Sequence, residues 1–247
     1  MINFKWKFIY WLSSPRLTAG LLLYSVIFIF LATIQIPALG ISQVQAKFFE
    51  AWFCNPLGGF LYVPGGMLVG VLALLNLAFS SFRFCARGVD GIGFATVHIA
   101  LMLLIVSGFL QGIWRVEGAI ELRQGEANST IYLSEGGGAE PKAITLPFSV
   151  ELVKFTEQKW DNSNLARQYS SLVKFRYEDI VIEKLIKMNE PASFGSWTFY
   201  QSSFRGEKVS VLQAVRNPAS LLPLVSVALI FGGMIIVYAL KLKRARR

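Results

Sequence analysis

The sequence predicts a membrane protein in which four apolar helices carry an all-β domain inserted between the third and the fourth helix. The first observation is composition: 54% of the 247 residues are hydrophobic and the mean hydropathy is +0.50, too apolar for a soluble domain of this size. The second is that four segments are as long and as apolar as a bilayer crossing, which takes about 20 residues. The third is a polar region of short alternating runs between two of these segments.

The four expected spans cover nearly all of the strongly apolar sequence. The first follows a basic N-terminus, but its apolar part is longer than the roughly 7–15 residues of a signal-peptide core, so we expect an uncleaved anchor. Their approximate limits are Leu17–Ile36, Pro64–Phe84, Ile92–Ile113 and Pro218–Leu240.

The charges predict the orientation of these spans. Ten Lys and Arg residues flank the N-terminus, the short loop between the second and third spans and the C-terminal tail, against one acid, Asp90. Residues 115–216 carry 13 basic and 13 acidic residues, so the formal net charge of +9 belongs to one side. The positive-inside rule then places both termini in the cytoplasm and the inserted domain outside it. The basic excess is an orientation and lipid-headgroup signal, so no nucleic-acid partner is expected.

The region between the third and fourth spans is expected to be β-rich. In one run Val173, Phe175 and Tyr177 alternate with charged residues, which is the period of a half-buried strand. Glycines 136–138 and the segment Asn189-Glu190-Pro191 are typical of turns. We expect a small β-sandwich or open barrel, and a division into residues 1–114, 115–217 and 218–247. Examples of the β-type runs are 129–135, 149–155, 171–177, 179–188, 195–204 and 209–215.

This outer domain offers no catalytic constellation. Residues 115–217 contain neither histidine nor cysteine, and no glycine-rich phosphate loop follows a strand. The two cysteines of the chain, Cys54 and Cys85, are expected on opposite membrane faces and therefore cannot pair with each other. Both are interpreted as structural, with a partner-directed thiol as the alternative for Cys54.

The most informative residue is His98, the only histidine of the chain, which lies within the uncharged third span. An ionisable side chain inside a membrane span is costly and is by default a hypothesis for a functional site. About six residues into the span, it is expected roughly 9 Å deep on the cytoplasmic side. Imidazole is a common ligand of haem iron, and a lone histidine supplies one axial bond, which favours a site shared between subunits.

A series of short motifs, in order along nearly the whole chain, gives the sequence a family resemblance. The chain resembles the ResB/CcsB family of cytochrome c biogenesis proteins (system II), although its outer domain is shorter than is usual there. The motifs are Ser13-Ser14-Pro15-Arg16-Leu17-Thr18, Leu75-Asn76-Leu77, His98, Leu146-Pro147-Phe148 with Phe155, Tyr169-Ser170-Ser171, Met188-Asn189-Glu190-Pro191, Phe199-Tyr200-Gln201-Ser202-Ser203 and Arg216-Asn217-Pro218.

The resemblance implies a role in haem handling at the bacterial cytoplasmic (inner) membrane. Proteins of this kind work with a ResC/CcsA-type membrane partner, carry haem b transiently across the bilayer and present it for attachment to apocytochrome c. His98 lies where the family has a histidine regarded as an axial ligand of the haem iron. The chain itself is then a non-catalytic or co-catalytic subunit of the haem-attachment (synthase) complex.

Simpler interpretations stay open beside these. One alternative is that His98 serves only in a hydrogen bond between helices. If the third helix extends back to residue 87, helical projection places Arg87 on the face of His98, where it would meet a haem propionate, but an anchor at the membrane surface is the simpler role. For the whole chain, the alternatives are a scaffold whose outer domain docks other proteins and a quinone-linked redox subunit, which would normally need a second histidine.

Overall fold

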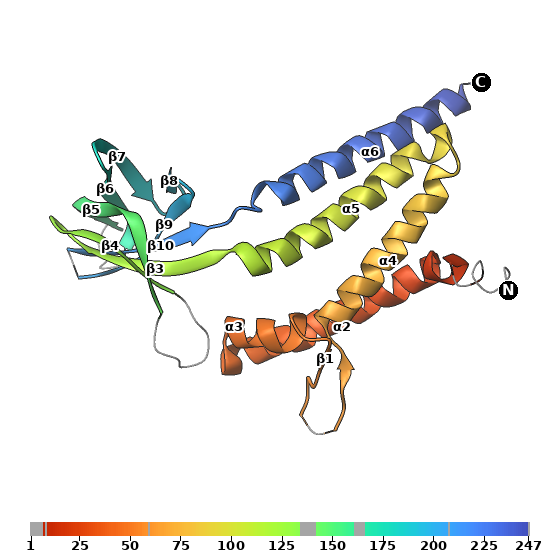
Figure 1. Ribbon diagram of the computed structural model, residues 1–247, viewed down its shortest axis with the longest axis horizontal. Helices are drawn as coiled ribbons and strands as arrows, with labels where there is room; N and C mark the ends of the chain where they lie inside the picture. The colour runs from red at the N-terminus through yellow and green to blue at the C-terminus, as the bar shows by residue number, and fades with distance from the viewer. Residues whose placement is uncertain are drawn as a thin grey trace. The chain divides into compact units, whose positions relative to one another are not determined.

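The structure is a computed structural model that describes residues 7, 9–58, 60–133, 142–160, 166–206 and 208–246. It divides into two compact units, which are described separately. The membrane unit comprises residues 1–112 and 219–247, and the β unit comprises residues 113–218. Figure 1 shows the helices of the first and the strands of the second.

In its described residues the membrane unit contains four helices long and apolar enough to cross a bilayer, which confirms the predicted architecture. Two of them begin a few residues after the expected limit. Pro64 belongs to a short strand and Pro218 to the turn before the last helix, so neither starts a helix. The helices are α2 (Pro15–Leu39), α4 (Gly66–Cys85), α5 (Val89–Trp114) and α6 (Leu221–Ala245).

Local chemistry fixes both ends of α2. The hydroxyl of Ser14 accepts a hydrogen bond from the backbone N–H of Arg16 at 3.2 Å, and Pro15 occupies the first turn, where its missing N–H costs nothing. At the other end Gly40 adopts a φ of +79°, and its N–H donates to the carbonyl of Ile36 at 2.8 Å. The helix therefore stops at a residue suited to reversing the chain.

The segment between α2 and α4 packs back along α2. It contains α3 (Ile41–Val44), the π-helical turn η1 (Gln45–Phe49) and a hairpin of β1 (Phe53–Cys54) and β2 (Val63–Pro64). Its buried residues form a cluster with Phe28 and Ala32 of α2, namely Val44, Phe48 and Cys54.

Helices α5 and α6 approach closely through a pair of glycines. A Cβ on Gly93 would lie 2.9 Å from the carbonyl oxygen of Gly233, and a Cβ on Gly233 would lie 3.0 Å from that of Gly93. Small residues at such a crossing let membrane helices pack in close contact. An ion pair between Asp90 and Arg244 joins the ends of the same two helices.

The described part of the β unit forms a single antiparallel sheet of eight strands. Their order is β7-β6-β5-β4-β3-β10-β9-β8, and bulges in the β4–β5, β5–β6 and β9–β10 pairings accompany its curvature into a nearly closed barrel. The strands are β3 (Val116–Arg123), β4 (Ala127–Leu133), β5 (Ala143–Lys159), β6 (Ala166–Tyr177), β7 (Ile180–Lys187), β8 (Ala192–Phe194), β9 (Trp197–Arg205) and β10 (Val209–Arg216).

Each predicted strand corresponds to an observed one, but two strands were not predicted. These are β3 and the short β8. β3 pairs with β10 along its length, from Val116 opposite Arg216 to Arg123 opposite Val209, so the first and last strands of the unit lie side by side. The predicted turn at residues 189–191 follows β7, whereas the glycines at 136–138 lie outside the described residues.

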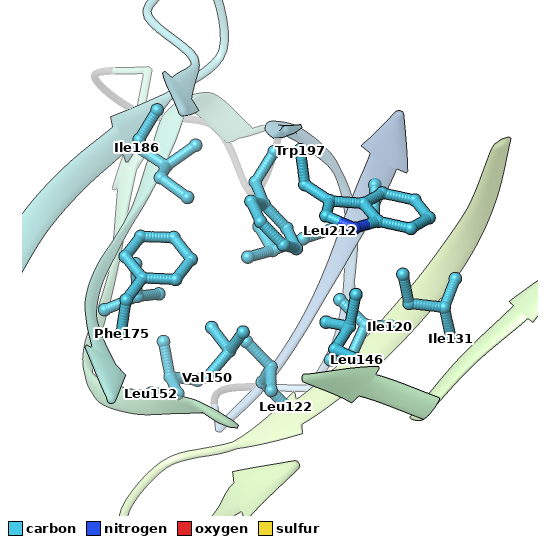
Figure 2. Packing of buried hydrophobic residues seen from close by; sticks show 14 of the residues in the cluster. Ile120, Leu122, Ile131, Leu146, Val150, Leu152, Phe175, Ile186, Trp197 and Leu212 are labelled. Atoms are coloured by element: carbon cyan, nitrogen blue, oxygen red, sulfur yellow. The ribbon is translucent and has the colours of Figure 1, made fainter. Parts of the chain in front are cut away.

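The interior of the curved sheet holds one hydrophobic core. Val173 and Phe175 are fully buried, as their alternation predicted, whereas Tyr177 at the end of β6 is 40% exposed. Figure 2 shows the core residues converging from opposite walls of the sheet. Of the two architectures expected, the open barrel is the one observed, because a single sheet supplies every wall.

A buried polar triad lies in the same interior and links β6 to β9 and β10, which are not its neighbours in the sheet. Ser171 of β6 donates to the side-chain carbonyl of Gln201 of β9 at 2.7 Å, and the Gln201 amide donates to the hydroxyl of Ser210 of β10 at 2.9 Å. The two serine hydroxyls are also 2.7 Å apart. The triad therefore fastens β6 to β9 and β10 across the barrel.

Candidate functional site

The candidate site lies where α4 turns into α5. Residues 86–88 form the turn, in which Gly88 has a φ of +62°. Gly91 then packs directly on the end of α4, since a Cβ there would lie only 1.8 Å from the carbonyl oxygen of Phe84. This close contact sets the start of α5 and brings the next turns of that helix against the Phe84 ring.

His98 is half-buried on α5 and its imidazole has a defined tautomer. Its Nδ1 lies 2.8 Å from the carbonyl oxygen of Phe94, and because a carbonyl can only accept, Nδ1 carries the proton and donates it. The Phe84 ring packs against the imidazole with centroids 4.9 Å apart. Within the described residues Nε2 has no hydrogen-bond partner, so its lone pair is available to a ligand.

Two arginines flank the histidine, and their surroundings differ. The Arg83 guanidinium donates to the hydroxyl of Ser13 at 2.9 Å and lies over the Tyr10 ring at 4.9 Å. The Arg87 guanidinium lies over Phe84, 5.0 Å from its centroid, and is exposed; it forms no ion pair with any residue that the structure describes. Arg83 thus fastens the N-terminal segment, whereas Arg87 remains free for an anion.

The wall opposite His98 comes from the start of α2, which Asn76 of α4 holds in place. The Asn76 side chain is 2% exposed, and its amide donates to the carbonyl of Leu12 at 2.6 Å. Its carbonyl accepts from the Thr18 hydroxyl at 2.8 Å. Two motifs from distant parts of the sequence therefore meet at one contact between α2 and α4.

These elements border a half-open cavity of about 470 Å³, which lies within the roughly 300–1,000 Å³ typical of small-molecule sites. One imidazole and two guanidinium groups border it, and most other lining side chains are apolar or carry a single hydroxyl. The lining residues are Ser13, Pro15, Thr18, Ala19, Leu22, Ser80, Arg83, Phe84, Arg87 and His98.

The structure brings both sequence-predicted site residues to this cavity, but not by the expected geometry. α5 begins at Val89, so Arg87 belongs to the turn and not to the helical face of His98 on which the projection placed it. Gly91 contacts the end of α4, whereas Gly112 has open space beside it. Sequence reasoning did not assign Arg83, Phe84 and Ser13 to the site, because their proximity depends on the crossing of α2 with α4.

In the described part of the chain, His98 is the side chain lining the cavity that could donate a nitrogen to a metal. No group of three or more His, Cys, Asp or Glu side chains is positioned to hold an ion there. Cys54 is buried in the cluster with Phe28, and Cys85 is exposed at the end of α4; neither lines the cavity.

Comparison with known proteins agrees with the motif series. The model of the ResB-like family matches residues 89–224, more than half of the chain. Protein NrfI of Wolinella succinogenes is 30% identical over 98 residues, which are 38% of this chain and 11% of that protein. The chain thus matches about a tenth of the length of this relative.

Among solved structures, the cytochrome c haem lyase CcmF matches 83% of this chain and 39% of its own, at 16% identity and a TM-score of 0.41, which is too weak a likeness to assign function. The family match covers α5, which carries His98, the whole β unit and the start of α6. The chain belongs to the ResB-like family of cytochrome c biogenesis proteins.

Proposed function

We propose that this protein is a haem-handling membrane subunit that helps to carry haem across the bilayer and presents it for attachment to apocytochrome c. The observation that carries the proposal is the placement of a donor-ready imidazole beside an unpaired arginine in one cavity. A haem offers complementary groups to such a cavity: an iron that takes imidazole, an apolar macrocycle and two carboxylates.

His98 would supply one axial bond to the iron through Nε2. The hydrogen bond from Nδ1 to the Phe94 carbonyl fixes the ring orientation and makes the imidazole a stronger donor, as such partners do for other metal-bound histidines. Since the chain contains a single histidine, a second imidazole for the iron would have to come from a partner. A ResC/CcsA-type membrane protein is the partner that the family resemblance suggests, with haem b held transiently between the two.

Arg87 would receive a propionate of the bound haem. Guanidinium pairs with carboxylate in a planar, bidentate geometry, and Arg87 has no other anionic partner among the described residues. Arg83 is the less suitable candidate, because Ser13 and Tyr10 already engage it.

The proposed orientation places the cavity near the cytoplasmic face of a bacterial inner membrane. Arg83 lies in the last turn of α4, and Arg87 lies in the turn that follows it. The basic end of α6 is held near the start of α5 by the Asp90–Arg244 ion pair, so these basic groups belong to the same end of the helices. Both termini are then cytoplasmic, and the β unit faces the compartment in which apocytochrome c is matured.

The test is the haem content of the protein purified together with its membrane partner. His98→Ala should remove most of the Soret absorbance per complex, whereas Thr96→Ala, two residues earlier on α5, should leave it unchanged. Arg87→Ala should weaken haem retention and Arg87→Lys should restore part of it, since a charge remains but the bidentate geometry is lost. An unchanged Soret band in His98→Ala would contradict the ligand role and favour a scaffold.

A further inference from the structure

The barrel of the β unit is incompletely closed between its two edge strands. β7 has eight residues, but β8 at the opposite edge has only three. Two contacts bridge the edges: Lys187 and Glu190 exchange backbone hydrogen bonds of 3.0 and 3.2 Å, and the Lys184 ammonium donates to the carbonyl of Ser193 at 2.5 Å. No ladder joins β7 to β8 elsewhere in the described residues.

The register with β6 shows which backbone groups of β7 point to the open side. Tyr177 pairs with Ile180 across the two-residue turn, so Ile180 and every second residue after it bond to β6. The backbone groups of Val181, Glu183 and Leu185 therefore face away from the sheet. Lys187 continues this alternation, because its N–H and C=O bond to Glu190. For the outward backbone groups of Val181, Glu183 and Leu185, the described part of the chain supplies no such partner.

Apart from Glu183, which pairs with Lys174, and Lys184, the side chains beside this edge are apolar and exposed. Ile182 shares a face with Ile186, which is fully buried in the core, yet Ile182 is 40% exposed and Ile180 is 53% exposed. On the other face Val181 and Leu185 are 53% and 48% exposed. A strand added along β7 would cover Ile180 and Ile182 with its own side chains. At the same time it would form hydrogen bonds with the free backbone groups of β7.

We infer that β7 is a docking edge for an extended, unfolded polypeptide that adds a strand beside Val181–Leu185. Alternating free N–H and C=O groups are matched by another extended backbone about 4.8 Å away, which a lipid does not offer. An exposed sheet edge of this kind is one that proteins ordinarily shield. The inference rests on the proposed function, which supplies such a chain: apocytochrome c before haem attachment.

The test uses the full chain in lipid nanodiscs and, as a probe, a fluorescent unfolded apocytochrome segment that contains its haem-attachment motif. Binding should slow amide hydrogen exchange at Val181, Glu183 and Leu185, with no comparable change on β3. Glu183→Pro removes an outward N–H without touching the β6 ladder, and should weaken probe binding at least tenfold. Glu183→Ala is the matched control and should stay within about twofold of the unsubstituted chain.

Equal binding by the Pro and Ala variants, or unprotected β7 amides in the bound state, would overturn the inference. Protection of these amides without probe in a particle of twice the expected mass would also overturn it, because a second copy then covers the edge. His98→Ala separates the two proposals. Haem retained in that variant while the probe still protects β7 refutes only the haem site, and haem lost while the probe leaves β7 unprotected refutes only the docking edge.

Discussion

Replacing Gln201 with leucine should destabilise the β unit by about 2–3 kcal/mol. The substitution removes the Gln201 hydrogen bonds to Ser171 and Ser210, and one of 3.4 Å to the Ser203 carbonyl. Each such bond contributes about 0.5–1.5 kcal/mol net. The two serine hydroxyls can still bond each other, so a single O–H is left without an acceptor, and an unsatisfied buried group costs about 1–3 kcal/mol. The similar volume of leucine keeps cavity terms small.

The assay is urea unfolding of the full chain in detergent, followed by the susceptibility of the β unit to a pulse of protease. Ser202→Ala is the control, since Ser202 is exposed in the same motif and its substitution should change the unfolding free energy by less than about 0.5 kcal/mol. Combining Gln201→Leu with Ser171→Ala should cost less than the sum of the single changes. Equal stability of Gln201→Leu and the unsubstituted chain would refute the role of the triad in holding the barrel together.

Three further predictions concern the membrane unit. Gly93→Leu should destabilise the α5–α6 contact by about 1–3 kcal/mol and lower the thermal unfolding midpoint in detergent. Gly108→Leu is the control and should not, because a Cβ there meets open space. Equal effects of the two substitutions would contradict the close glycine contact between α5 and α6. Burial raises the pKa of the Cys54 thiol against the opposing effect of Lys47, so at pH 8 iodoacetamide should modify Cys54 more slowly than the exposed Cys85. Denaturation in SDS should abolish the difference, and faster reaction of Cys54 in the folded chain would refute the burial argument. A periplasmic reporter inserted after Gly125 should be active and one after Arg246 inactive; the opposite pattern would reverse the proposed orientation.

The fold could largely be predicted from the sequence because its two units have different hydrophobic periods. Long apolar runs determine the four helices, and alternation determines strands such as β6, where Val173 and Phe175 enter the core. β3 escaped prediction because Gly118 and Ala119 interrupt its alternation, although Ile120 and Leu122 are both buried. β8 is three residues long, too short for any periodic signal.

The candidate site could be predicted only in its central residue. An isolated histidine in an uncharged span is visible in the sequence, and so is the basic loop beside it. The contribution of α2 is not, because it depends on the hydrogen bonds of Asn76 to a segment some 60 residues earlier. The motifs around Ser13 and Asn76 thus have a common structural purpose that no local pattern reveals.

The most direct test of the central claim is chemical rescue of the haem ligand. His98→Gly in the co-purified complex should lose the Soret signature of a six-coordinate haem, and added imidazole should restore it by occupying the space vacated beside Phe84. The same treatment should leave the spectrum of the unsubstituted complex unchanged. A His98→Gly complex with the original spectrum before any imidazole is added would contradict the assignment of His98 as an axial ligand.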